Sequence, residues 1–184
     1  MRILITGAAG FIGFHAAQEF LRRGWDVVGL DNFNDYYSIN LKRDRAGRLA
    51  SGSSCAPVRD LDICDLAELQ VLFADESPDV VLHLAAQPGV RYSITHPFIY
   101  QKTNVEGFLN VLECCRHAAK TPKLVFASSS SVYGGNKKMP FEESDPLTFE
   151  GTTLIVEGIH NLSSQLVSHI LTATLAGKAN HVLH

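Results

Sequence analysis

The chain has 184 residues, of which 46% are hydrophobic and 19% are charged, a composition typical of one folded domain with an apolar core. The net charge of −3 and the lack of any basic run argue against a nucleic acid or an anionic membrane surface as partner. No apolar stretch approaches the roughly 20 residues that cross a bilayer, and a strand is predicted directly after Met1. We therefore expect no transmembrane helix and no signal or transit peptide. The four cysteines lack metal-ligand spacing, so we expect reduced structural thiols, a cytoplasmic protein and no bound metal.

The first elements are predicted to be a strand, a glycine-rich turn and a helix. Residues 2–6 form a short apolar run, Gly7 opens the turn, and an amphipathic helix follows over 11–23 and ends at Gly24. A second apolar run, 26–30, is too short for a helix and indicates a strand.

The rest of the first 128 residues continues this alternation. We expect helices over 41–50, 66–74 and 98–119, and strands near 57–59, 80–84 and 123–128. Asp65-Leu-Ala-Glu68 has capping-box spacing at the start of the second of these helices. Continuous apolar strands separated by helices predict a parallel sheet that is covered on both faces. The predicted fold class is therefore α/β, a doubly wound, Rossmann-like parallel sheet.

The glycine-rich turn has the spacing of a phosphate-binding device. Gly7 permits the turn, Gly10 lets the backbone approach a diphosphate, and Gly13 lets the helix pack close to the sheet. Free N–H groups and the positive end of the helix dipole then point at one spot. Asp31 follows the second strand, where a carboxylate accepts the ribose hydroxyls of an adenosine and repels a 2′-phosphate, which favours NAD over NADP. A solvated turn aspartate is the alternative.

The spacing Gly-x-x-Gly-x-x-Gly resembles the extended short-chain dehydrogenase/reductase family. Three further segments are similar to it: Asp62-Ile63, which in the family meets the adenine edge; His83-Leu-Ala-Ala86, the end of the fourth strand; and Asn104-Val-Glu-Gly107, whose asparagine braces the active-site backbone. Loop solvation is the alternative for Asp62, and we interpret His83 itself as a core histidine. The resemblance implies NAD as cofactor, bound by Gly7, Ala9, Gly10, Phe11, Ile12, Gly13, Asp31, Asn32, Asp62, Ile63, Leu84, Ala85, Ala86, Asn104 and Ser128.

The segment from Ser128 to Gly134 is similar to the family's signature after the fifth strand. By its spacing to Tyr133, Ser129 falls on the catalytic serine or threonine, although four serines after a strand also read as a polar turn. Two loops, Asp31-Asn-Phe-Asn-Asp-Tyr-Tyr37 with Leu41-Lys-Arg43 and Gln87-Pro-Gly-Val-Arg-Tyr-Ser93, look like those of UDP-glucuronate or UDP-galacturonate 4-epimerases. The resemblance implies a UDP-sugar substrate bound by Arg91, Ser130 and Ser131, with a surface arginine an equal alternative for Arg91. The serine run lacks the acidic pair of dehydratases, which weakens a dehydratase or decarboxylase as the activity.

The resemblance ends near residue 147. The family's chemistry uses Tyr-x-x-x-Lys, in which tyrosine removes the proton of the sugar 4-hydroxyl and lysine lowers the tyrosine pKa; these positions hold Leu154 and Gly158. We therefore predict an NAD-binding domain over 1–147 and a divergent tail over 148–184, helical or poorly ordered, that leaves the sheet incomplete and one edge uncovered. A truncation or reading-frame change near residue 147 explains both the loss of the Tyr-x-x-x-Lys pair and the loss of the later strands and the C-terminal substrate-binding region that the family has.

Two functions follow from this pattern. The first is an NAD-dependent nucleotide-sugar 4-epimerase by descent, truncated and with impaired or absent turnover. The second is a non-catalytic NAD-binding module or a regulatory partner of a full-length relative. The family pairs subunits through helices that flank the active site, which implies a homodimer or a heterodimer.

Overall fold

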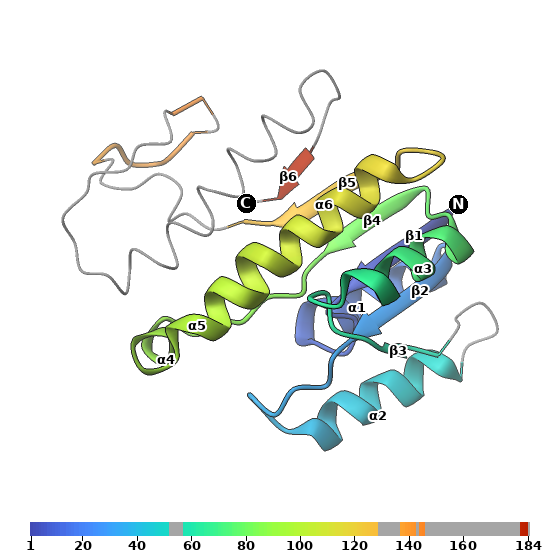
Figure 1. Ribbon diagram of the computed structural model, residues 1–184, viewed down its shortest axis with the longest axis horizontal. Helices are drawn as coiled ribbons and strands as arrows, with labels where there is room; N and C mark the ends of the chain where they lie inside the picture. The colour runs from blue at the N-terminus through green and yellow to red at the C-terminus, as the bar shows by residue number, and fades with distance from the viewer. Residues whose placement is uncertain (52–56, 129–136, 143, 146–180, 184) are drawn as a thin grey trace.

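A computed structural model describes residues 1–51, 57–128, 137–142, 144–145 and 181–183 of the chain. In these residues six parallel strands form one sheet in the order β3-β2-β1-β4-β5-β6 (Figure 1). The strands are β1 (Arg2–Thr6), β2 (Asp26–Asp31), β3 (Arg59–Asp60), β4 (Val80–His83), β5 (Lys123–Ala127) and β6 (His181–Leu183). The order reverses between β1 and β4, which makes the carboxyl ends of these two strands the expected place for a ligand.

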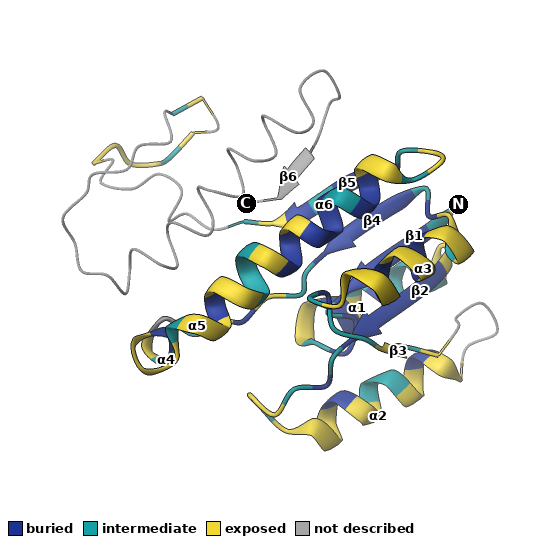
Figure 2. Cartoon of the chain, viewed as in Figure 1, coloured by how far each residue is buried: buried dark blue, intermediate teal, exposed yellow. Residues whose placement is uncertain are grey.

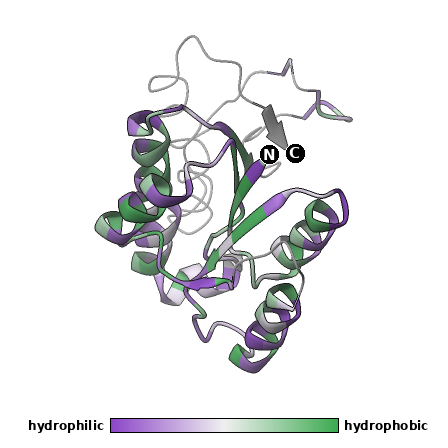
Figure 3. Cartoon of the chain, turned by 90° about the vertical axis from the view of Figure 1, so that its right-hand side faces the viewer, coloured by the Kyte–Doolittle hydropathy of each residue, from purple (hydrophilic) through white to green (hydrophobic). Residues whose placement is uncertain are grey.

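The helices connect the strands and lie on both sides of the sheet (Figure 3). They are α1 (Phe11–Arg22), α2 (Ile39–Ala50), α3 (Leu66–Glu76), α4 (Val90–Thr95), α5 (Pro97–Tyr100) and α6 (Phe108–His117), with a π-helical turn at Gln101–Gly107 between the last two. Ser38 and Asp65 cap α2 and α3 by accepting backbone N–H groups with their side chains. The predicted α/β, Rossmann-like fold is confirmed.

Alternating side chains of the strands build two apolar layers, because successive residues of a strand point to opposite faces. Leu4, Val28 and Val81 pack with residues of α3 and α6 on one face. Ile3 and Ile5 pack with Phe14 and Ala17 of α1 on the other. The central strands are buried, while the outer surfaces of the helices are exposed (Figure 2).

The structure corrects several predicted boundaries. β3 begins at Arg59 instead of residue 57, and the long helix predicted over 98–119 runs from Pro97 to His117 with a π-helical turn inside it. Gly89 has φ of +96° and precedes α4, a helix in a segment that sequence reasoning treated as a loop. The Pro-Gly pair before α4 indicates a turn, and the positive φ of Gly89 provides it. The pair does not indicate that a helix follows the turn.

The tail prediction was wrong at its end. Residues 181–183 form β6, which pairs with Val125–Ala127 of β5 and is neither helical nor unordered. An unpaired strand edge offers a row of free N–H and C=O groups, so a strand that pairs there satisfies them. The remainder of the predicted tail, 148–180 and 184, lies outside the described residues.

Candidate functional site: a dinucleotide pocket

The turn after β1 is held open for a ligand by its glycines. Gly7 has φ of +71°, and a Cβ there would lie 2.9 Å from the backbone nitrogen of Ala85. A Cβ on Gly13 would overlap the carbonyl oxygen of Gly7, whereas the Gly10 N–H donates to that same oxygen at 2.9 Å. No side chain caps α1, so its amino end presents backbone N–H groups to the pocket.

Asp31 is the buried last residue of β2 and faces this turn. Its Oδ2 accepts the N–H of Ala9 at 3.2 Å and its Oδ1 accepts the N–H of Phe33 at 2.9 Å. Lys42 Nζ lies 3.6 Å from Oδ1, and both side chains are almost fully buried. The carboxylate is therefore fixed in place by two backbone donors and one cation.

Asp62 connects the end of β3 with the loop after β2. It accepts the Asn32 side-chain amide at 2.9 Å and the Cys64 N–H at 2.8 Å. Burial opposes ionisation of Asp62, but the hydrogen bonds from Asn32 and Cys64 outweigh it, so the pKa of this carboxyl is lowered. Asp62 therefore accepts hydrogen bonds that hold two loops together, and is not simply a solvated loop residue. Its contact with adenine stays a prediction.

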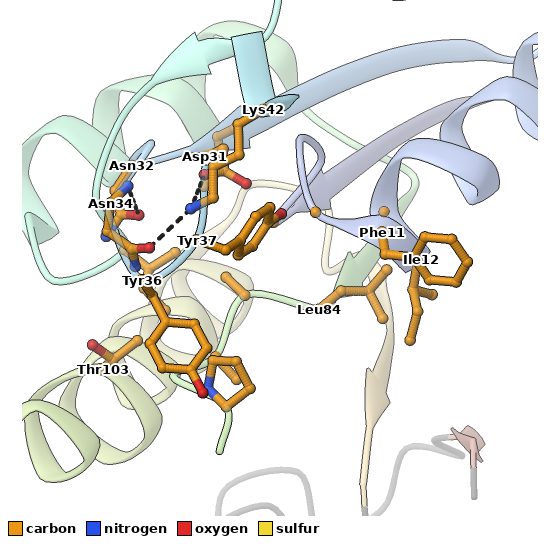
Figure 4. Close-up of a pocket in the computed structure, with 18 of the residues that line it drawn as sticks. Phe11, Ile12, Asp31, Asn32, Asn34, Tyr36, Tyr37, Lys42, Leu84 and Thr103 are labelled. Atoms are coloured by element: carbon orange, nitrogen blue, oxygen red, sulfur yellow. Dashed lines mark hydrogen bonds and ion pairs between the residues drawn. The ribbon is translucent and has the colours of Figure 1, made fainter. Parts of the chain in front are cut away.

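The end of β4 supplies the floor of the site. His83 is buried, stacks on Phe108 and hydrogen-bonds Thr6, which confirms its interpretation as a core histidine. Burial lowers the pKa of His83 to about 3, so the ring is neutral at physiological pH. The chain then continues through Leu84, Ala85 and Ala86, all of which line the pocket; Leu84 is labelled in Figure 4.

The pocket has a volume of about 550 Å³, within the range of small-molecule sites, and opens at the carboxyl ends of the strands. Of the predicted NAD-binding residues, it brings together Gly7, Gly10, Phe11, Ile12, Gly13, Asp31, Asn32, Ile63, Leu84, Ala85 and Ala86. Ala9, Asp62, Asn104 and Ser128 are not among its lining residues.

Asn104 lies in the π-helical turn and clamps the backbone of Gln87. Its Oδ1 accepts the Gln87 N–H at 2.7 Å and its Nδ2 donates to the Gln87 carbonyl at 3.2 Å. This is the bracing role implied by the family resemblance; π-helical turns frequently occur at functional sites. A direct contact of Asn104 with the cofactor stays a prediction.

Of the predicted substrate residues, Arg91 alone lies in the part of the chain that the structure describes. Arg91 is exposed on α4 and is not a lining residue. Ser128 follows the end of β5, and Ser129, Ser130 and Ser131 lie outside the described residues, as do Leu154 and Gly158.

Sequence reasoning assigned no role to several side chains that line the pocket from the loop after β2 and from α2. They are Asn34, Tyr36, Tyr37 and Lys42 (Figure 4), together with Leu41 and Arg45. Arg45 donates to the Tyr37 hydroxyl at 3.3 Å and to the Ala9 carbonyl at 3.4 Å, which ties α2 to the glycine turn. The two tyrosines and Lys42 belong to the loop segments whose resemblance to 4-epimerases was noted, but their spacing alone does not show which side chains face inward.

These residues fit an adenine dinucleotide. The glycine turn leaves room for backbone amides to approach a diphosphate. The fixed carboxylate of Asp31 lies at the end of the adjacent strand, β2, where an adenosine ribose would be. No group of three or more potential metal ligands occurs among the described residues. None of the helices described has both the length and the apolar character needed to cross a bilayer.

Comparison with known proteins agrees with this geometry. The sequence profile of the NAD dependent epimerase/dehydratase family matches residues 3–153, and the chain belongs to this family. It is 50% identical over 143 residues to UDP-glucuronate 4-epimerase 2 of Arabidopsis thaliana, which covers 78% of this chain and 32% of that protein. It is 42% identical over 181 residues to protein CapI of Staphylococcus aureus, which covers 96% of this chain and 52% of that protein.

A solved structure shows the same arrangement. The crystal structure of UDP-glucuronic acid 4-epimerase from Bacillus cereus, in complex with UDP-glucuronic acid and NAD, superposes with a TM-score of 0.79 at 31% identity. The superposition covers 100% of this chain and 55% of that one, so the chain spans about half the length of this neighbour. The family match runs to residue 153 and the CapI alignment covers 96% of the chain, so the similarity extends past residue 147, where the sequence analysis expected it to end. The truncation or reading-frame change near residue 147 stays a prediction.

Proposed function

We propose that this chain binds NAD and is the cofactor-binding part of a UDP-sugar 4-epimerase whose own turnover is impaired or absent. The observation that carries the proposal is the glycine turn facing a fixed, buried Asp31 across a pocket of about 550 Å³. NAD, when bound, supplies a hydride acceptor and donor. The backbone amides at the start of α1 bind its diphosphate, and Asp31 accepts its adenosine ribose hydroxyls.

UDP-glucuronate and UDP-galacturonate are the substrates we propose, since UDP-glucuronate 4-epimerases are among the relatives and among the structural neighbours. In this assignment Ser129 is the catalytic serine that hydrogen-bonds the sugar 4-hydroxyl, and Arg91 approaches the sugar carboxylate. The impairment follows from the family spacing, which puts Leu154 and Gly158 where a tyrosine and a lysine move the proton. Loss of a general acid–base group costs about 10²–10⁴ in rate.

The alternative is a non-catalytic NAD-binding module or a regulatory partner of a full-length relative, as a homodimer or heterodimer. Both functions require NAD binding and differ only in turnover. A location in the cytoplasm is part of the same proposal.

Two measurements test these functions. Titration calorimetry of the purified chain with NAD should show a saturable heat, and no heat from a folded sample would overturn the proposal. Incubation with UDP-glucuronate and NAD, followed by chromatography, separates the two functions. Slow formation of UDP-galacturonate supports an impaired epimerase, whereas no product from a chain that binds NAD supports the non-catalytic module. Calorimetry suits this test better than tryptophan fluorescence, because Trp25, the single tryptophan of the chain, precedes the six-residue strand β2 and so lies about 20 Å from the pocket end of the sheet.

A further inference from the structure

Lys42 is a lysine that is only 4% exposed and lies in the wall of the pocket. Its Nζ donates to Asn34 Oδ1 at 2.9 Å, lies 3.6 Å from Asp31 Oδ1 and sits 4.8 Å above the ring centroid of Tyr37 (Figure 4). Lysine is almost never buried to this degree unless it is paired. The position of Lys42 therefore depends on its partners at the ribose end of the pocket.

Lys42 and Asp31 both keep hydrogen-bonding capacity that the described residues do not use. An ammonium group has three N–H donors, and Asn34 takes one of them. The 3.6 Å separation from Asp31 is too long for a hydrogen bond. Each carboxylate oxygen of Asp31 accepts one backbone N–H and retains a further lone pair.

A hydroxyl group complements this arrangement. It has one proton to donate and two lone pairs to accept with, so it accepts from Nζ of Lys42 and donates to a carboxylate oxygen of Asp31. A vicinal diol presents two such hydroxyls side by side. The pair also keeps the ribose end of the pocket electrically neutral, so that a buried carboxylate is not left without a counter-charge.

Resting on the proposed function, we infer that Lys42 is a positioning residue for the cofactor, which donates a hydrogen bond to an adenosine ribose hydroxyl while Asp31 accepts from the same diol. Lys42 is thereby added to the ribose site, which the sequence analysis assigned to Asp31 alone. A hydrogen bond from a charged donor is worth about tenfold or more in affinity.

The test couples a protein change to a ligand change. NAD and its analogues lacking the adenosine 2′- or 3′-hydroxyl are titrated into the wild type and into Lys42→Met. Removal of the contacted hydroxyl should cost the wild type at least about tenfold more affinity than it costs Lys42→Met, in which only the hydrogen bond to Asp31 is left to lose. Arg48→Met, which removes an exposed cation from the same helix, is the matched control and should behave as the wild type.

The outcomes separate this inference from the proposed function. A wild type that binds no NAD overturns both. A wild type that binds NAD, with equal hydroxyl dependence in Lys42→Met, overturns the role of Lys42 and leaves NAD binding intact. If Lys42→Met fails to fold because Asp31 is left unpaired, Asp31→Asn/Lys42→Met removes both charges and is compared with Asp31→Asn. The double variant should then show less hydroxyl dependence than Asp31→Asn, and equal dependence overturns the inference.

Discussion

Thr6 and His83 share a buried hydrogen bond at the carboxyl ends of β1 and β4, with 2.8 Å between Thr6 Oγ1 and His83 Nδ1. The same Oγ1 accepts the N–H groups of Leu84 and Ala85 at 3.1 and 3.0 Å. A hydroxyl has one proton and two lone pairs, so Thr6 donates to Nδ1 and the neutral imidazole carries its proton on Nε2. One threonine thus orients both the histidine and the backbone that forms the floor of the pocket.

This arrangement predicts a specific dependence of stability on pH. Burial lowers the pKa of His83 to about 3, whereas in the unfolded chain histidine titrates near about 6.5. Between these values the unfolded state binds a proton that the folded state does not, so stability falls as the pH falls, by about 1.4 kcal/mol per pH unit. Urea unfolding of the wild type and His83→Phe at pH 7.5, 5.5 and 4.5 measures this contribution, which should be missing from the variant.

Thr6→Val is the control for this experiment. It removes the hydroxyl but leaves His83 buried, so it should lower stability at every pH and keep the slope of the wild type. An identical pH dependence in the wild type and His83→Phe would show that His83 does not cause it.

The glycine turn predicts a contrast between two alanine substitutions. Gly13→Ala puts a Cβ onto the Gly7 carbonyl oxygen, so we expect a loss of about 1–3 kcal/mol in unfolding free energy and at least about tenfold weaker NAD binding. Gly47→Ala lies within α2 with open space around the new Cβ, and should gain about 0.5–1 kcal/mol without changing NAD affinity. Thermal unfolding and calorimetry measure both. Equal NAD affinity in the two variants would contradict the role of Gly13.

The clamp between Asn104 and Gln87 predicts that a substitution far in sequence from the glycine turn lowers both stability and NAD affinity. Asn104→Ala removes both hydrogen bonds to the Gln87 backbone, so stability should fall by about 1–3 kcal/mol. NAD affinity should fall as well, because the segment before Gln87 lines the pocket. Gln101→Ala, at an exposed position of the same π-helical turn, should leave both unchanged. Wild-type values for Asn104→Ala would rule out the clamp.

The parts of this protein that the sequence predicts well are those set by local physics. The apolar run of β1 and the glycines after it determine a strand, a turn and a helix with little help from the rest of the chain. Lys42 shows the opposite case, because a lysine on a polar helix reads as solvent-exposed. Its burial results from α2 packing across the pocket onto Asp31, Asn34 and Tyr37, contacts that periodicity does not encode.

The same reasoning explains the unpredicted helix and π-helical turn. α4 has six residues and follows a Pro-Gly pair, so its sequence has no helical period long enough to detect. The π-helical turn depends on where Asn104 meets the Gln87 backbone, a contact between separate segments. Both features lie beside the pocket, where tertiary contacts override local preference.

The approach of Tyr36 to Gly89 predicts a second contrast between glycine positions. The Tyr36 ring packs edge-on against Tyr92 with 5.2 Å between centroids, and its hydroxyl occupies the space that a Cβ on Gly89 would need. Gly89→Ala should therefore displace Tyr36 from the pocket wall, in addition to the strain of about 1–2 kcal/mol that an alanine incurs at φ of +96°. NAD affinity, measured by calorimetry, should fall.

Gly24 separates the two causes, because it has φ of +76° but nothing within 4 Å of a new Cβ. Gly24→Ala should lose the same 1–2 kcal/mol or so from backbone strain and bind NAD as the wild type does. Adding Tyr36→Phe to Gly89→Ala removes the hydroxyl that the Cβ meets, and should restore part of the stability that Gly89→Ala loses beyond Gly24→Ala. If the double variant is no more stable than Gly89→Ala, the overlap with the Tyr36 hydroxyl is not what excludes a side chain at Gly89.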